Sequence, residues 1–182
     1  MKLSIIIVII AVAGILLLGF AGKFLISEVV SEVAVEKREE ITDARIGKLS
    51  PYFELPDLNG PKVKSTDFLE KPIVIIFWAS WNEESANQIK ILDDYLPKHR
   101  SELFEILTIS SQEDKSAVLN FMLRGNYKVK VLLDESGEIT EKYGARSLPA
   151  AYFADKDGQL RYIHIGALSE SGLVEKAEKL LK

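Results

Sequence analysis

The stretch "PIVIIFWASWNEES", residues 72–85, joins two different patterns of side chains. Its first half is a continuous apolar run, Ile73 to Trp78, which is rich in β-branched residues and too short for a typical helix. We therefore predict a central strand that is buried on both faces. The segment after it predicts a helix, because its apolar residues recur at helical spacing, at Ile89, Leu92 and Leu96.

The composition is that of an acidic globular protein. The chain has 182 residues, of which 47% are hydrophobic and 27% are charged, and its formal net charge is -4. It has room for one domain with a proper core, and no basic excess that would favour nucleic acid as a partner. It contains no cysteine. A thiol mechanism is therefore impossible for this chain alone.

The first segment reads as a membrane anchor. No residue from Leu3 to Phe20 is charged, and a helix rising ~1.5 Å per residue over that run can cross a hydrocarbon core of ~30 Å. We predict a single-pass transmembrane anchor over residues 1–22, with a cleavable signal peptide as the alternative. Lys2 favours a cytoplasmic N-terminus, which places the rest in the periplasm or otherwise outside the cytoplasmic membrane. Residues 23–45 would form a helical stalk or a polar tether.

Residues 46–182 alternate between strand and helix patterns. Asn59-Gly60 predicts a tight hairpin between short extended pieces, and Ser169 can cap a last amphipathic helix. The order βαβ, then ββα, predicts an α/β fold with a mixed central sheet and helices on both faces. Besides the first strand and helix, we expect strands at 103–110 and 129–134, a helix closing at Gly125, a short helix at 138–144 and a β-hairpin over 149–166.

Three stretches in this order resemble one family: "SPYFELPDLNG", "KPIVIIFWASW" and "VLLDESGEITEKYGARSLPAAYFADKDGQLRYIHIGAL". The resemblance is to the membrane-anchored thioredoxin-like proteins of bacteria, the TlpA/ResA type within the redoxin and AhpC/TSA group. It covers roughly Ile46 to Lys182 and implies a thioredoxin-like fold. In that family "FWASW" is followed by Cys-x-x-Cys, and the position of Pro149 carries a cis-proline that faces the two cysteines.

The departures from the family pattern bear on function. Asn82 and Ser85 stand at the two cysteine positions, Glu84 stands where the family commonly has proline, and Ile76 stands where thioredoxins keep a buried aspartate. Asn cannot attack a disulfide, and Ser is too weakly acidic to do so without a base. The chain is therefore expected to lack the family's thiol-disulfide reaction.

The residues at the helix start also have a purely structural explanation. Asn82 is among the best N-cap residues, and Glu83 and Glu84 meet the positive end of the helix dipole. The alternatives are a polar binding spot made by Asn82, Glu83 and Ser85, or a hidden catalytic role. Neighbouring Glu side chains on a helix diverge, and neither His99 nor His164 has ligand spacing, so we expect no metal site and no cofactor.

The resemblance also implies a binding groove. In the family's fold an aromatic residue and the backbone before the cis-proline hold an extended peptide, and Trp81, Leu148 and Pro149 occupy these positions, with Glu83 and Glu84 nearby. We expect a redox-inactive domain that binds or assembles an exported protein, in cytochrome c maturation or envelope redox assembly. The alternatives are an oxidoreductase or peroxiredoxin-like member that works with a partner's cysteines, and a structural subunit of a membrane complex.

Overall fold

The computed structural model describes residues 29, 32–33, 35–36, 43–97 and 104–181. The chain separates into two units, Met1–Glu40 and Ile41–Lys182. Among the described residues, no helix is both long and apolar enough to span a bilayer. The predicted anchor over residues 1–22 and most of the predicted stalk lie outside the described residues, so both stay predictions.

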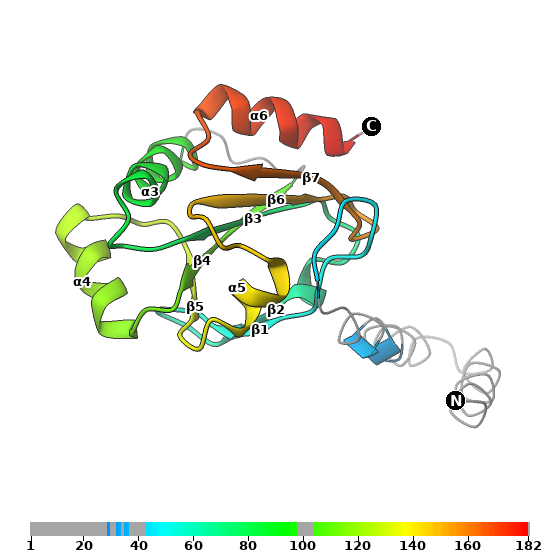
Figure 1. Ribbon diagram of the computed structural model, residues 1–182, viewed down its shortest axis with the longest axis horizontal. Coiled ribbons are helices and arrows are strands. Elements are labelled where there is room, and N and C mark those ends of the chain that lie inside the picture. Colours follow the sequence, from blue (N-terminus) through cyan, green and yellow to red (C-terminus); the bar gives the residue numbers. More distant parts are fainter. Residues whose placement is uncertain (1–28, 30–31, 34, 37–42, 98–103, 182) are drawn as a thin grey trace. The chain divides into compact units, whose positions relative to one another are not determined.

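The second unit is built on a five-stranded mixed sheet with the strand order β5-β4-β3-β6-β7 (Figure 1). The strands β3 (Ile73–Trp78), β4 (Glu105–Ser111) and β5 (Val131–Asp134) run parallel to one another. The strands β6 (Ala150–Ala154) and β7 (Leu160–Ile165) are each antiparallel to their neighbours. All of β3 is buried, which confirms the prediction from its continuous apolar run.

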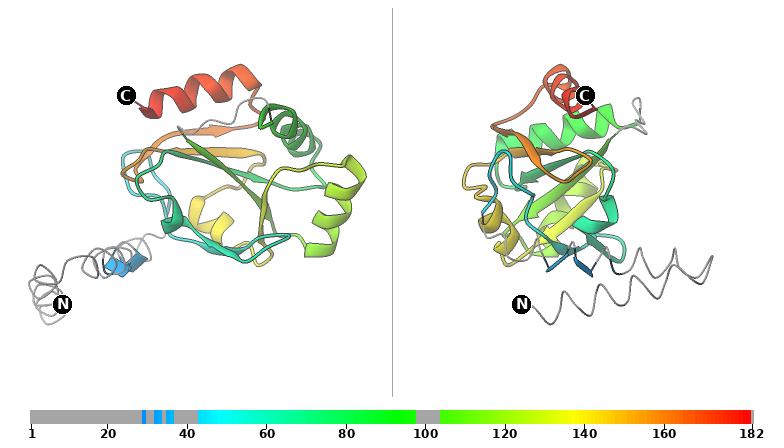
Figure 2. Two further views of the ribbon diagram at one scale, coloured as in Figure 1. Left: turned by 180° about the vertical axis from the view of Figure 1, so that it is seen from behind. Right: turned by 90° about the vertical axis from the view of Figure 1, so that its right-hand side faces the viewer.

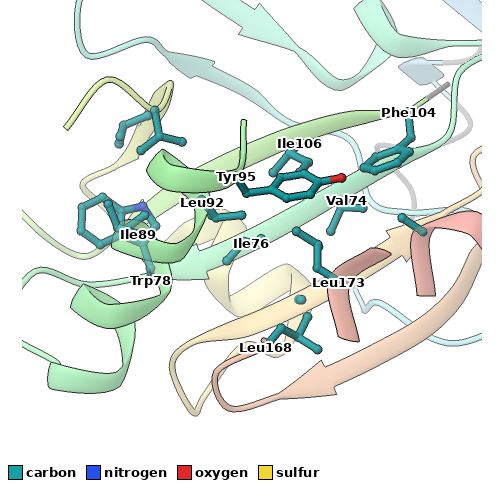
Figure 3. Close-up of a cluster of buried hydrophobic side chains, with 14 of the residues drawn as sticks. Val74, Ile76, Trp78, Ile89, Leu92, Tyr95, Phe104, Ile106, Leu168 and Leu173 are labelled. Atoms are coloured by element: carbon teal, nitrogen blue, oxygen red, sulfur yellow. The ribbon is translucent and has the colours of Figure 1, made fainter. Parts of the chain in front are cut away.

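One hydrophobic core lies on the face of the sheet that Val74, Ile76 and Trp78 reach (Figure 3). The connections from β3 to β4 and from β4 to β5 each contain a helix and step in the same direction along the sheet. Right-handed connections of this kind place their helices on one face of the sheet, and both helices pack against this core. Figure 1 shows two helices of this face, α3 (Glu83–Tyr95) and α6 (Glu170–Glu178), above the sheet. The elements on this face are α3 (Glu83–Tyr95), α4 (Lys115–Gly125), α6 (Glu170–Glu178) and the short 3-10 helix η2 (Lys179–Leu181).

A second core lies on the opposite face, which Ile73, Ile75 and Phe77 reach. It is covered by one helix and by a small antiparallel hairpin, which Figures 1 and 2 show together on that side of the sheet. The prediction of helices on both faces is therefore confirmed. The covering elements are β1 (Glu54–Pro56), β2 (Lys62–Lys64), the 3-10 helix η1 (Ser65–Phe68) and α5 (Glu138–Tyr143).

The hairpin of β1 and β2 differs from the predicted tight turn. Pro56 pairs with Lys62, so the connection is the longer loop 57–61 and not a two-residue Asn59-Gly60 turn. The Asp57 carboxylate closes this loop by accepting a hydrogen bond from the backbone N–H of Asn59 at 2.8 Å. A side-chain hydrogen bond therefore stabilises the reversal of the chain, in place of the expected two-residue backbone turn.

The end of α4 also differs in detail from the prediction. The left-handed residue that ends the helix is Asn126, with φ 52°, whereas Gly125 is the last helical residue. A Cβ at Gly125 would overlap the ring of Tyr127. The glycine therefore permits close packing of an aromatic ring, and the asparagine supplies the left-handed turn.

Candidate functional site

The candidate site lies at the edge of the sheet where the three parallel strands end. The strands β3, β4 and β5 finish at Trp78, Ser111 and Asp134. In open α/β sheets the carboxyl ends of such strands form the usual binding crevice. The polar residues that follow these strands are therefore the ones to consider for chemistry or binding.

Asn82 caps α3, as predicted. Its side-chain oxygen accepts a hydrogen bond from the backbone N–H of Ser85 at 2.8 Å, and its own backbone is extended, as an N-cap requires. Glu83 and Glu84 are exposed in the first turn, near the positive end of the helix dipole. Neither makes an ion pair with another described residue. The start of α3 is thus stabilised locally by these three residues.

Ser85 is completely buried, and its hydroxyl has no hydrogen-bond partner among the described residues. It therefore cannot join Asn82 and Glu83 in a polar surface spot, and no base activates it. One helical turn further on, Gln88 is also buried; its side-chain oxygen accepts from the Leu168 N–H at 2.6 Å, while its nitrogen is unpartnered. The second cysteine position is thus occupied by a hydroxyl in surroundings that offer it no hydrogen bond.

A groove of about 720 Å³ opens beside the start of α3. The structure places Trp81 and Leu148 together in its wall, whereas Glu83 and Glu84 do not line it. Trp81 is 70% exposed, while the other tryptophan, Trp78, is fully buried. The lining residues are Trp81, Asn82, Ser111, Gln112, Gly137, Thr140, Glu141, Ala145, Arg146, Ser147 and Leu148.

The chain around Pro149 has the shape that the family resemblance implies. The Leu148-Pro149 bond is cis, which confirms that prediction. The backbone N–H and C=O groups of Ser147 and Leu148 have no hydrogen-bond partner among residues 43–97 and 104–181. The backbone N–H of Gly166 donates a hydrogen bond to the Pro149 carbonyl at 2.8 Å. The neighbouring Ile165, which is 53% exposed, pairs with Ala150 and so lies at the same end of the sheet as Pro149. Ile165 is an apolar surface residue that the sequence analysis missed.

Glu113 was also missed, although it fixes the loop that carries Trp81. It is buried, and its carboxylate accepts hydrogen bonds from the Ser80 N–H at 2.7 Å, from the Ser80 hydroxyl and from the Ser110 hydroxyl at 3.1 Å. These bonds tie the loop after β3 to the end of β4. The run of polar residues "SSQED" directly after an apolar strand is the signal that could have pointed to it.

The inner end of the groove holds a second polar cluster. The Asp134 carboxylate accepts from the backbone N–H of Ile139 at 3.3 Å and of Thr140 at 2.7 Å, and from the Thr140 hydroxyl at 2.7 Å. The Thr140 hydroxyl also lies 2.9 Å from the hydroxyl of Ser111. Gln112, with φ 56°, lies next to Ser111 in the wall. None of these residues was singled out from the sequence.

The histidines provide no metal site among the described residues. His164 lies half-buried on β7 opposite Ala151, and His99 lies outside the described residues. In the part of the chain that the structure describes, no group of three or more His, Cys, Asp or Glu side chains could hold a metal ion. The groove is lined by hydrogen-bonding, charged and apolar side chains.

Burial raises the pKa of Tyr152 to about 12. Its hydroxyl donates to the backbone carbonyl of Tyr143 at 2.7 Å, and the two rings meet edge to face in the second core. Tyr152 is not among the residues that line the groove. This shift therefore reflects packing and does not mark a site.

Comparison with known proteins gives a consistent result. The family model of the AhpC/TSA family matches residues 46–163. The thiol-disulfide oxidoreductase ResA of Bacillus thuringiensis subsp. konkukian is 31% identical over 135 residues, which are 74% of this chain and 78% of that protein. The ResA of Bacillus subtilis is 26% identical over 125 residues, 69% of this chain and 70% of that protein.

A solved structure extends the likeness to the fold. The exposed lipoprotein thioredoxin Etrx1 of Streptococcus pneumoniae has a TM-score of 0.64 and 28% identity, covering 70% of this chain and 98% of that one. The mixed five-stranded sheet and the cis bond before Pro149 are what the family resemblance of the sequence implies. The chain therefore belongs to the AhpC/TSA family, as a ResA-like protein with a thioredoxin-like fold and no cysteine.

Proposed function

We propose that this protein is a membrane-tethered, redox-inactive thioredoxin-like domain that binds an extended segment of an exported protein. The observation that carries the proposal is the pairing of an intact groove with unreactive cysteine positions. Trp81 is exposed and lines the groove with Ser147 and Leu148, whose backbone groups have no hydrogen-bond partner in the part of the chain that the structure describes. Asn82, in contrast, serves as a helix cap, and Ser85 is buried. A segment laid along Ser147 could pair with this backbone as an added strand does.

The exposure of Trp81 supports a binding role on energetic grounds. A Trp side chain buries about 150–250 Å² when covered, and apolar burial contributes about 25 cal/mol per Å². Since 70% of this residue is exposed, a partner that covers it gains about 3 kcal/mol before ordering costs. This is the size expected of an interface hot spot. We expect Trp81→Ala to weaken binding of the partner by about 30-fold or more.

The location outside the cytoplasm is part of the same proposal. It is supported by the uncharged run from Leu3 to Phe20 and by the likeness to an exposed lipoprotein thioredoxin. The family resemblance of the sequence suggests that the partner acts in envelope redox assembly, such as cytochrome c maturation. Protease protection of the full-length protein in spheroplasts tests the orientation, because a cytoplasmic domain would stay protected until the membrane is lysed.

Site-specific photocrosslinking in intact cells tests the binding role. A photoreactive amino acid replaces Trp81 in one variant and Leu123 in the other, since Leu123 on α4 is equally exposed, at 68%, but does not line the groove. We expect one exported protein to be captured through position 81 and not through position 123, with the captured segment identified by mass spectrometry. Equal capture at both positions, or capture of cytoplasmic proteins alone, would refute the proposal.

A further inference from the structure

The loop 57–61 between β1 and β2 contains a chemically labile dipeptide. Asn59 is followed by Gly60, and this is the only Asn-Gly pair in the chain. Asparagine is among the thermolabile residues of proteins. The backbone nitrogen of the next residue can attack its side-chain amide carbon, which requires an accessible side chain, an unhindered nitrogen and a pliable backbone. The loop meets all three requirements.

The two reacting groups are free within the part of the chain that the structure describes. Asn59 and Gly60 are both exposed, and no described residue makes a hydrogen bond with the Asn59 side chain or with the Gly60 N–H. Because Gly60 has no Cβ, no side chain of its own hinders the approach of its nitrogen. The Gly60 nitrogen can therefore act as the nucleophile, and the Asn59 side chain can turn toward it.

The backbone of the loop is held by weak closing bonds. The carboxylate of Asp57 accepts a hydrogen bond from the Asn59 N–H at 2.8 Å. The Asp57 N–H donates to the Pro61 carbonyl at 3.3 Å, which is longer than the usual range of about 2.7–3.2 Å for such a bond. Residues 59 and 60 can thus change their backbone angles while the strands of the central sheet stay paired.

We propose that Asn59 is a site of spontaneous deamidation, and that its isoaspartate product weakens the attachment of the β1–β2 hairpin to β5. The Gly60 nitrogen forms a bond to the side-chain carbonyl carbon of Asn59, and the side-chain amide leaves as ammonia with the proton of that nitrogen. Water then opens the resulting cyclic imide at either carbonyl. Opening at the side-chain carbonyl gives aspartate. Opening at the main-chain carbonyl gives isoaspartate, whose backbone is longer by a methylene group.

The place of the loop in the fold gives the reaction a structural consequence. Leu58 is buried, and its N–H donates to the Val131 carbonyl at 2.9 Å. Asp57 forms a β-bridge with Leu132, so the two residues together cover the outer edge of β5. A longer backbone at residue 59 displaces both, and the new carboxylate repels that of Asp57. The modified protein therefore has a looser hairpin and a partly open sheet edge, which is a site for pairing with other chains.

Incubation of the full-length protein in detergent and mildly alkaline buffer tests the proposal. Peptide mass spectrometry follows the conversion of Asn59 to the acid, and electron-based fragmentation distinguishes aspartate from isoaspartate. We expect both products at Asn59. Asn126 is the internal control, because it is also exposed but precedes the bulky Tyr127. Its side-chain oxygen accepts a hydrogen bond from Lys128 Nζ at 2.9 Å, and we expect it to remain an amide.

Two variants connect the reaction to its nucleophile and to its consequence. Gly60→Ala fits the loop, because Gly60 has no positive φ and a Cβ there lies 3.6 Å from the nearest atoms, in Asp57. It should slow the loss of the amide at least about tenfold, since the added methyl group hinders the attacking nitrogen. Asn59→Asp carries the new charge without the longer backbone. Hydrogen exchange at the Leu58 N–H should be at least about tenfold faster in the isoaspartate form than in Asn59→Asp, because its bond to Val131 is weakened.

The two parts of the proposal fail on different results. An Asn59 amide that survives as long as that of Asn126 would refute the modification site. Equal rates in the wild type and Gly60→Ala would refute it too, as would aspartate as the sole product, because direct hydrolysis by water needs no attack by Gly60. If isoaspartate forms but Leu58 exchanges as slowly as in Asn59→Asp, the weakening of the hairpin is wrong and the modification site stands.

Discussion

The double substitution Asn82→Cys with Ser85→Cys should restore a reversible disulfide at the start of α3. Positions i and i+3 of a helix are neighbours, and Asn82 already contacts the N–H of Ser85 at 2.8 Å. Replacing the Asn cap removes about 1 kcal/mol of stability. Closing a loop of four residues contributes about 2 kcal/mol in the chain-entropy account. The oxidised variant should thus be about 1 kcal/mol more stable than the wild type, and the reduced variant about 1 kcal/mol less stable.

Urea unfolding with and without reductant measures this difference, and thiol titration counts the free cysteines. The wild type, which has no cysteine, should be unaffected by reductant. A matched control is Asn82→Cys with Glu84→Cys, because side chains at i and i+2 point apart on a helix and should not form an intramolecular bridge. If Asn82 and Ser85 are not the equivalents of the two family cysteines, the first pair will also fail to oxidise.

The reactivity of the restored pair should remain poor for an electrostatic reason. The helix dipole lowers the pKa of the first thiol, whereas the carboxylates of Glu83 and Glu84 raise it. Adding Glu83→Gln and Glu84→Pro should therefore lower this pKa and speed reduction of a model disulfide. Thiolate absorbance against pH measures the change. An unchanged pKa would show that the two glutamates are screened by solvent.

Three further changes test the packing of the site. Ser85→Ala should raise the free energy of unfolding by up to about 1 kcal/mol, because it removes a buried hydroxyl that has no hydrogen-bond partner within the described residues. A lower free energy of unfolding, measured with urea, would reveal a hidden hydrogen bond. Glu113→Gln should destabilise by about 2 kcal/mol and weaken peptide binding, because three donors then face one acceptor oxygen; unchanged stability and affinity would contradict this role. Burial raises the pKa of Tyr152 to about 12 from its ordinary value of 10.0, so its stabilising contribution is complete below pH 10 and is lost as the pH rises toward 12. Tyr152→Phe should therefore make the free energy of unfolding less dependent on pH between pH 10 and pH 12. If the variant and the wild type show the same dependence on pH, Tyr152 is not the group responsible.

The elements of the fold that rest on local pattern could be predicted from the sequence. The strand Ile73–Trp78 follows from a continuous apolar run, because only burial on both faces suits such a run. The cap at Asn82 follows from residue type, because its side chain acts on its own first turn. The cis bond before Pro149 came from the family resemblance, since composition cannot specify it.

The groups that define the inner groove could not be predicted, because their partners are distant in sequence. Glu113 fixes a loop that lies 33 residues earlier, and Ser111 meets Thr140 across 29 residues. Each of these residues also has an ordinary local interpretation as part of a polar loop. The left-handed turn at Asn126 was missed for a related reason, since Gly125 is the more usual choice for it and is instead needed beneath a ring.

The two cysteine positions differ in a way that bears on what the site still does. Asn82 has a structural role, because it satisfies a backbone donor at the helix start. The Ser85 hydroxyl has no such role, since it is buried and has no hydrogen-bond partner among the residues that the structure describes, in surroundings that would suit a weakly polar sulfur atom. If stability alone had shaped the site, burying Trp81 and removing the Ser85 hydroxyl would both be favourable. Instead Trp81 stays 70% exposed, on a loop that the buried Glu113 holds in place. An exposed tryptophan on a fixed loop is favourable only when something covers it, and this is why the groove, and not the former reaction centre, is where the function of this protein should be sought.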